Sequence, residues 1–126
     1  MIRSDVEALI HSNFGGIVQD YPWEGSPEYT IFRHADNKKW FALIAKVKYQ
    51  ALNIDKAGST DIINLKSDPD LTEELIKTPA ILPAYHMNKR HWITIRLDQF
   101  ENLDLLGSLI DKSYGLTSKK RRRILD

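Results

Sequence analysis

The sequence predicts an α+β domain in which helices near the N- and C-terminal ends of the chain pack on an antiparallel β-sheet. Apolar residues recur every three to four positions near both ends, which is the spacing of an amphipathic helix. Between those ends lie segments rich in Tyr, Thr, Ile and Phe, and two of them flank a turn sequence as in a hairpin. The resulting order of helix, strands, helix, strand and helices is typical of α+β domains.

The first element is expected to be a helix. Ser4 and Glu7 have the spacing of a capping box, in which the two side chains satisfy free amides at a helix start. Gly15 and Gly16 are expected to end this helix. Its apolar stripe consists of Val6, Leu9, Ile10 and Phe14.

An antiparallel hairpin is expected next. Residues 17–27 contain Pro and Gly and are expected to be irregular. Glu28–His34 alternates as a strand does, and Lys39–Val47 favours a second strand. Ala35–Lys38 has turn chemistry, because Asp and Asn tolerate left-handed backbone geometry.

The middle of the chain is expected to contain two more strands and a second helix. Tyr49–Asp55 favours a short strand, and Asp61–Lys66 favours another. Asp68 followed by Pro69 is typical of a helix start, and Pro79 is expected to end that helix. Its apolar stripe consists of Leu71, Leu75 and Ile76.

The last third is expected to contain a loop, a strand and two helices. Pro83–Arg90 is expected to be a loop or a single helical turn, followed by a strand at His91–Leu97. An apolar stripe that ends at Gly115 predicts a long helix, and Thr117 can cap a last short helix. The stripe consists of Leu103, Leu106, Leu109, Ile110 and Tyr114.

Length and composition limit the class of protein. The 126 residues correspond to one domain, so we expect residues 1–126 to form a single unit. The absence of Cys excludes disulfides, thiolate metal sites and a Cys nucleophile. The longest apolar run, Trp40–Ala45, has six residues, whereas a membrane-spanning helix needs about 20. We therefore expect a cytoplasmic protein without a membrane segment, with a monomer as the favoured oligomeric state.

Charge is distributed unevenly along the chain. Residues 1–111 carry 12 basic and 16 acidic side chains, whereas residues 112–126 carry six basic side chains and one acidic one. Such a basic run indicates contact with nucleic acid or another polyanion, or else a solvated chain end. The run consists of Lys119, Lys120, Arg121, Arg122 and Arg123.

The sequence lacks the common catalytic motifs. It contains no Gly-rich phosphate loop with a following Lys-Ser/Thr, no G-x-S-x-G and no H-E-x-x-H. The acidic residues near Asp68–Glu74 suit the start of a helix, where negative charge is favourable. We therefore expect a non-enzymatic binding domain with no catalytic residues and no cofactor.

The segment Leu82–Ile95 concentrates polar and aromatic side chains ahead of a strand. His86 and His91 lack a third ligand nearby, so no metal site is predicted. Two interpretations stay open for the segment: its side chains tie the loop to the strand, or they face an anion or a nucleic-acid backbone. The residues concerned are Tyr85, His86, Asn88, Lys89, Arg90, His91 and Trp92.

Strand alternation predicts which side chains share a sheet face. If Ile93, Ile95 and Leu97 face the core, then Trp92, Thr94 and Arg96 face the opposite side. For the strand at Lys39–Val47, the same rule predicts a core set of Phe41, Leu43, Ala45 and Val47, opposed to Trp40, Ala42, Ile44 and Lys46. The second face would then carry Trp40, Lys46, Lys66, Trp92 and Arg96. Such a surface suits stacking on bases, unless the terminal helix covers it.

Several segments together resemble the MmcQ/YjbR family. They are Lys39–Leu43, Asp61–Pro69, Leu82–Ile93 and the closing Leu109–Tyr114, and the most specific part is His-x-Asn-Lys-x-His-Trp at residues 86–92. The resemblance implies a small bacterial α+β domain with a CyaY/frataxin-like sandwich of helices on an antiparallel sheet. It also implies DNA binding through a double-wing arrangement of hairpins, and it supplies no catalytic residues. The acidic iron-binding ridge of frataxins is not matched, because the first helix carries only Asp5 and Glu7.

Two binding hypotheses follow. In the first, DNA backbone phosphates are contacted by basic residues of two hairpin wings, of a loop and of the C-terminal run. These residues are Lys38, Lys39, Lys56, Lys89, Arg90, Lys119, Lys120, Arg121, Arg122 and Arg123, with Lys56 expected close to the first hairpin tip. In the alternative, a small molecule or a protein binds the second sheet face and the adjoining loop. That site would consist of Trp40, His86, Asn88, His91, Trp92 and Arg96.

Overall fold

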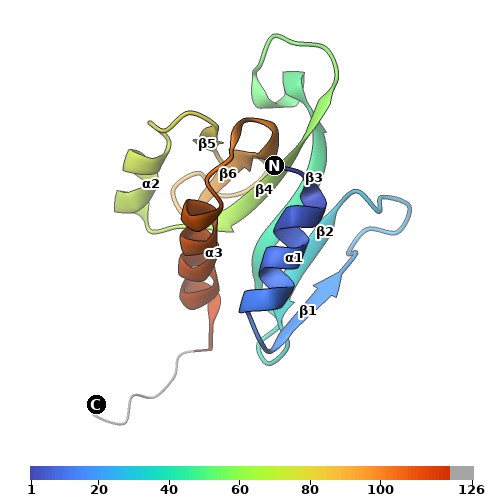
Figure 1. Cartoon of the computed structure of the whole chain (residues 1–126), viewed down its shortest axis with the longest axis vertical. Coiled ribbons are helices and arrows are strands. Elements are labelled where there is room, and N and C mark those ends of the chain that lie inside the picture. Colours follow the sequence, from blue (N-terminus) through green and yellow to red (C-terminus); the bar gives the residue numbers. More distant parts are fainter. Residues whose placement is uncertain (120–126) are drawn as a thin grey trace.

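Six strands form one antiparallel sheet in the computed structural model, which describes residues 1–119 (Figure 1). In chain order the strands are β1 (Ile17–Asp20), β2 (Thr30–His34), β3 (Trp40–Lys48), β4 (Ser59–Lys66), β5 (Ile81–Pro83) and β6 (Trp92–Arg96). Their order across the sheet is β1-β2-β3-β4-β6-β5, and each neighbouring pair is antiparallel. The α+β class with an antiparallel sheet is confirmed.

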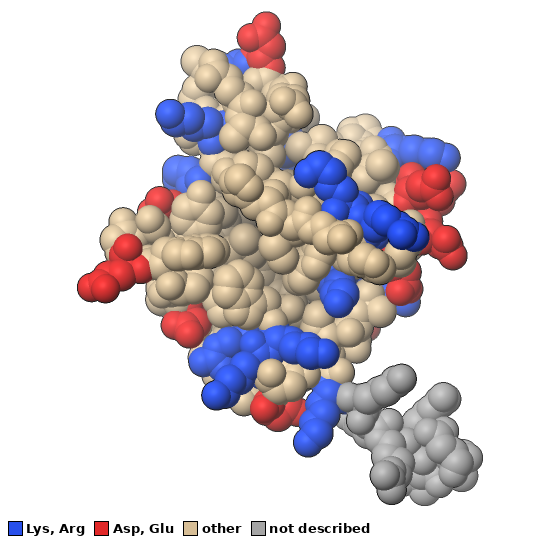
Figure 2. Space-filling model, turned by 180° about the vertical axis from the view of Figure 1, so that it is seen from behind, with Lys and Arg blue, Asp and Glu red and all other residues tan. Residues whose placement is uncertain are grey.

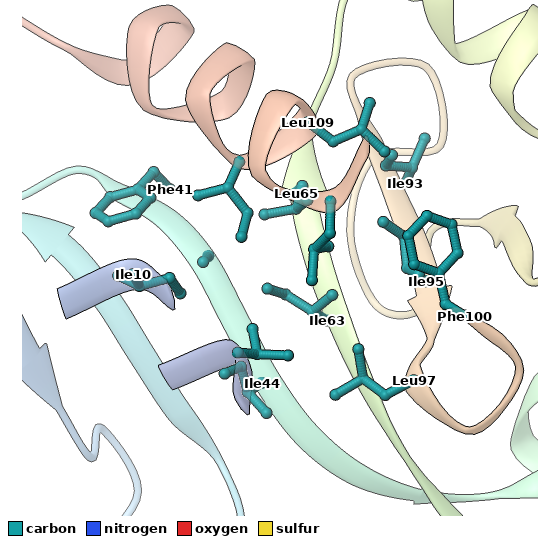
Figure 3. Close-up of a cluster of buried hydrophobic side chains, with 14 of the residues drawn as sticks. Ile10, Phe41, Ile44, Ile63, Leu65, Ile93, Ile95, Leu97, Phe100 and Leu109 are labelled. Atoms are coloured by element: carbon teal, nitrogen blue, oxygen red, sulfur yellow. The ribbon is translucent and has the colours of Figure 1, made fainter. Parts of the chain in front are cut away.

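The two long helices, α1 (Arg3–Asn13) and α3 (Leu103–Thr117), pack on the same face of the sheet (Figure 1). A third helix, α2 (Pro69–Leu75), is short. The helices and strands bury a common apolar core, part of which Figure 3 shows. Its members include Val6, Ile10, Phe41, Ile44, Ile63, Leu65, Ile93, Ile95, Leu106, Leu109 and Ile110. The opposite face of the sheet carries a smaller apolar cluster of Ala45, Val47 and Ile62.

A β-bulge in β3 changes which side chains face the helices. Phe32 pairs with Ala42 but Arg33 pairs with Trp40, so Phe41 is an extra residue in the ladder. Beyond it, Ala42 and Ile44 join the core, and Leu43, Ala45 and Val47 turn to the opposite face. The predicted alternation along β3 is therefore correct for Trp40 and Phe41 and wrong after Phe41, because one extra residue reverses every later side chain. Lys46, which pairs with Asp61, is accordingly not on the face of Trp40.

A serine of α3 bridges the bulged residue Phe41 of β3 and Lys66 of β4, just beyond the last pair of the β3–β4 ladder. The Ser113 hydroxyl, which is fully buried, donates to the carbonyl oxygen of Phe41 at 2.5 Å. The backbone N–H of Lys66 donates to the same hydroxyl oxygen at 2.8 Å. Because buried backbone groups without partners are costly, this side chain stabilises the bulge from the helix side.

Several local predictions are wrong for identifiable reasons. The helix α1 begins at Arg3, so Ser4 is already inside it, and the Asp5 carboxylate accepts the Ile2 N–H instead at 3.1 Å. Tyr49–Asp55 is not a strand, because a 3₁₀ helix at Tyr49–Leu52 ends in a left-handed residue, Asn53, with φ 60°.

The edges of the sheet and two helix features also differ from the predictions. The edge strands β1 and β5 have only four and three residues and show no alternation by which to find them. In α2 the buried residue is Thr72, whereas Leu71 and Ile76 of the predicted stripe are each 37% exposed. Thr117 is buried as the last residue of α3, where its hydroxyl donates to the Ser113 carbonyl.

In residues 1–119 there is no helix of the length and apolar character that crossing a bilayer requires.

Ser113→Ala tests the account of the bulge. The change removes the hydroxyl that bonds to Phe41 and Lys66, so two buried backbone groups lose a partner. We expect a loss of about 1–3 kcal/mol in the free energy of unfolding, measured by urea denaturation. Ser108→Ala is the matched control in the same helix, because the Ser108 hydroxyl is exposed and bonds only within α3. Equal stability of the two variants would show that the bulge does not depend on Ser113.

Candidate ligand-binding pocket

An apolar pocket of about 370 Å³ opens on the sheet face that α1 and α3 leave uncovered. Its lining comes from three parts of the chain: the β1–β2 connection, the start of β3 and the β5–β6 loop. The lining residues are Trp23, Ser26, Tyr29, Trp40, Leu43, Tyr85, His86 and Met87. Figure 2 views the side away from the two long helices, where uncharged surface separates the groups of charged side chains.

In the lining, the Trp23 ring stands at a steep angle to two other aromatic rings. The Trp23 ring lies 5.2 Å from the Tyr29 ring, with an angle of 80° between the planes. It lies 6.0 Å from the Trp40 ring at 87°. Trp23 is 47% exposed, so this indole forms an outer wall rather than part of the core.

Two different backbone features position the aromatic walls: hydrogen bonds in the β1–β2 connection and the bulge in β3. In the β1–β2 connection the Ser26 N–H donates to the Trp23 carbonyl, and the Tyr29 N–H donates to the Ser26 carbonyl, both at 3.1 Å. Trp40 is the first residue of β3, directly before the bulge. The bulge places Trp40 on the same face as Leu43, three residues later, whereas regular alternation would oppose them.

Tyr85 is held by two buried polar side chains of the neighbouring strands. Asn64 in β4 and Thr94 in β6 are both fully buried and lie opposite each other in the ladder. The Asn64 amide donates to the Tyr85 carbonyl at 2.9 Å, and the Tyr85 N–H donates to the Thr94 hydroxyl oxygen at 2.8 Å. The Thr94 hydroxyl donates to the Asn64 amide oxygen, which completes the network. These hydrogen bonds therefore fix the backbone of Tyr85, whose ring is one of the aromatic walls of the pocket.

The Tyr85 phenol of the pocket favours its neutral form. Burial raises the pKa of Tyr85, and the neighbouring Tyr29 phenol raises it further. A phenol with a raised pKa stays protonated at neutral pH, so Tyr85 can donate a hydrogen bond but carries no negative charge.

Two polar side chains of the β5–β6 loop, those of Asn88 and Lys89, make hydrogen bonds to backbone groups of the same loop. The Asn88 carboxamide oxygen accepts the N–H groups of Arg90 at 2.9 Å and His91 at 3.2 Å. The Lys89 ammonium donates to the Ala84 carbonyl at 2.9 Å. For Asn88 and Lys89 the structure thus favours the interpretation in which the side chains tie the loop together. Of the loop residues predicted to bind a ligand, His86 alone lines the pocket, with a left-handed φ of 58°.

The remaining residues of the predicted second-face site lie apart from the pocket. Trp92 is half-buried and pairs with Lys66 across the ladder. The Arg96 guanidinium makes two hydrogen bonds to Asp98, at 3.1 and 2.9 Å, and lies over the Tyr49 ring. Although burial opposes it, hydrogen bonds from Arg96 and Tyr49 lower the pKa of Asp98. The Arg96 guanidinium is therefore already paired with the Asp98 carboxylate.

The predicted DNA-contacting residues fall into separate groups. Lys38 and Lys39 lie at the β2–β3 turn, which the Asn37 amide joins to the Thr117 carbonyl at 2.8 Å, so Lys119 lies at the same end. Figure 2 accordingly shows basic side chains next to the start of the grey segment. The rest of the basic run, Lys120, Arg121, Arg122 and Arg123, lies outside the described residues.

Lys56 does not lie near the first hairpin tip, and that expectation is wrong. It follows the far end of β3, a strand of nine residues, so it lies roughly 30 Å from Lys39 along the sheet. There its ammonium lies 4.6 Å from the centre of the Tyr49 ring. Lys89 and Arg90 form a third group in the β5–β6 loop.

Two wider hollows lie between α1 and α3, with volumes of about 440 and 460 Å³. Their walls mix apolar side chains with exposed acids such as Asp5 and Asp104, and neither contains an aromatic cluster like that around Trp23. In residues 1–119 no group of three or more His, Asp or Glu side chains is placed to hold a metal ion. The aromatic pocket therefore differs from these two hollows in its predominantly apolar and aromatic walls.

Sequence reasoning finds only part of this pocket. Trp40 and His86 are among the predicted ligand-binding residues, and both line it. Trp23 and Met87 are missing from that prediction because they lie in irregular segments that no periodicity marks, and Tyr29 is missing although it lies in the alternating segment Glu28–His34. The pair of aromatic residues in Trp23–Tyr29, within a Pro- and Gly-containing connection, is the signal that could have found them.

Comparison with known proteins gives consistent results across the chain. The curated relatives include an uncharacterised protein, YyaQ, of Bacillus subtilis, which is 39% identical over 93% of this chain and 98% of its own. Another is the uncharacterised protein YbdF of Escherichia coli O157:H7, which is 31% identical over 81% of this chain and 79% of its own.

Solved structures also resemble this fold. A crystal structure of a Pseudomonas syringae protein superposes with a TM-score of 0.89 at 39% identity, covering 94% of this chain and all of that one. A Deinococcus radiodurans protein superposes with a TM-score of 0.71 at 27% identity, covering 97% of this chain and 82% of that one. The model of the YjbR family matches residues 12–116, and the chain belongs to that family.

Proposed function

We propose that this protein is a non-catalytic binding module whose ligand is a small organic molecule held in the aromatic pocket. The observation that carries the proposal is the apolar space on the uncovered sheet face that is lined by Trp23 and by the two rings perpendicular to it, Tyr29 and Trp40. A half-exposed Trp in such a place contributes little to the core, and its position is explained by a ligand that packs against it.

The size and the walls of the pocket support this function. Its volume of about 370 Å³ lies within the range of roughly 300–1,000 Å³ that is usual for small-molecule sites. Such sites are mainly apolar and aromatic with a few polar groups, here the Ser26 hydroxyl, the tyrosine phenols and His86. These groups suit binding and orientation of a ligand more than proton transfer.

Trp23→Ala tests the pocket with the neutral probe 2-naphthol. Removing the indole takes away one wall, so we expect a roughly fivefold weaker affinity in equilibrium dialysis, equivalent to about 1 kcal/mol for one aromatic contact. Tyr21→Ala is the matched control, because Tyr21 is 53% exposed in the same connection but outside the lining. Equal loss of affinity in both variants, or no binding of either 2-naphthol or tetramethylammonium to the unmodified protein, would contradict the proposal.

A second function, contact with the DNA backbone, is favoured by one observation. The hydrogen bond from Asn37 to Thr117 joins the turn that carries Lys38 and Lys39 to the end of α3. From that end the sequence continues into its basic run. Phosphate contacts from such residues supply affinity without much sequence preference. We propose this end of the molecule, rather than the hairpin wings and the β5–β6 loop together, as the candidate DNA surface.

The salt dependence of DNA binding tests this second function. In the double variant Lys38→Gln/Lys39→Gln, the slope of log affinity against log salt should become shallower by about 0.9 for each phosphate that the two lysines neutralise. Lys56→Gln, at the other end of β3, should leave the slope unchanged. An absence of duplex DNA binding at about 50 mM salt, where backbone contacts are strongest, would refute DNA binding by this protein.

A further inference from the structure

We infer that the aromatic pocket recognises the trimethylammonium group of a small quaternary ammonium compound. This inference rests on the proposed binding function and names the class of its ligand. It follows from the shape of the walls, from the charge of the lining and from the way the walls are held.

The angles between the rings favour a round group over a flat one. Trp23 is nearly perpendicular to both Tyr29 and Trp40, so its ring forms a right-angled corner with each of them. A flat aromatic ligand can stack on only one wall of a corner at a time. A trimethylammonium group is nearly spherical and presents methyl groups in several directions, so it contacts two perpendicular walls together.

The charge of the lining favours a cation that makes no hydrogen bonds. No Asp, Glu, Lys or Arg is among the lining residues in the described part of the chain. The faces of indole and phenol rings carry the negative part of their quadrupole and attract a cation within about 6 Å. A primary ammonium would also need acceptors for its three N–H groups, whereas a quaternary ammonium has none to satisfy.

The backbone of two of the walls is held in place without a ligand. Trp40 lies on a central strand, and the Tyr85 backbone is held by the buried Asn64 and Thr94. Rigid walls lower the entropic cost of binding, which matters for a ligand that gains affinity only from dispersed contacts. Met87 adds a polarisable side chain to the same lining.

The test compares two ligands that differ in charge but hardly in shape. Choline and 3,3-dimethyl-1-butanol are isosteres, because the second has a carbon in place of the quaternary nitrogen. In calorimetric titrations at constant ionic strength we expect choline to bind roughly tenfold more tightly, the effect of a desolvated cation–π contact. Ethanolamine, which has a primary ammonium, should bind more weakly than both.

Trp23→Leu is the diagnostic variant, because it keeps an apolar wall and removes the π face. It should abolish most of the preference for choline over 3,3-dimethyl-1-butanol. Tyr21→Leu is the control and should keep the preference, because Tyr21 lies outside the lining. A thermal melt of each variant establishes that folding is unchanged, as expected for these half-exposed side chains.

The outcomes separate the inference from the proposed function. The inference is supported if choline binds more tightly than 3,3-dimethyl-1-butanol and if Trp23→Leu removes most of this preference. If the neutral isostere binds as tightly as choline, the ligand class is wrong and the pocket still binds an organic molecule. If neither ligand binds and 2-naphthol also fails, the proposed function falls as well. If the protein binds phosphatidylcholine vesicles but not choline, the trimethylammonium group that it recognises belongs to a lipid headgroup. The proposal of a small-molecule ligand is then wrong.

Discussion

The bulge in β3, whose extra residue Phe41 accepts a hydrogen bond from Ser113 of α3, is the constraint on which the core and the pocket both depend. The bulge turns Phe41 and Ala42 toward the helices in succession, and it leaves Trp40 and Leu43 together on the opposite face. A regular strand would move Ile44 out of the core and Leu43 into it. The Ser113 hydroxyl of α3 thus stabilises the bulge. The bulge in turn places Trp40 and Leu43 together on the sheet face away from α3.

The pocket exists because both long helices pack on one face and leave the other face to loops. The β1–β2 connection contributes Trp23 and Tyr29, and the β5–β6 loop, far along the chain, contributes Tyr85. Binding residues are often carried on loops that a rigid scaffold positions. Here the scaffold is the central part of the sheet, including the buried Asn64–Thr94 pair beneath Tyr85.

The hairpin at residues 28–47, the strand at the Trp92 segment and the last helix could be predicted because each has a local pattern. The bulge could not, since an extra residue is defined only by the partner strand and leaves no mark in the periodicity of β3 itself. For the same reason the prediction of the second sheet face is correct in β4 and β6 but not beyond Trp40 in β3. The polar β5–β6 loop is ambiguous in the sequence, because Asn88 and Lys89 are equally suited to a ligand and to the backbone groups that they bind.

The three tryptophans of the chain allow a direct test of whether a ligand binds in the aromatic pocket. Each indole N–H gives its own signal in a ¹H–¹⁵N NMR spectrum, so a titration with tetramethylammonium reports on all three positions together. The account predicts saturable shifts for Trp23 and Trp40, which line the pocket, and an unchanged signal for Trp92, which lies on the same sheet face outside it. Saturable shifts at Trp92 alone, or no saturable shift at any indole in this titration and in a parallel one with 2-naphthol, would contradict binding in the pocket.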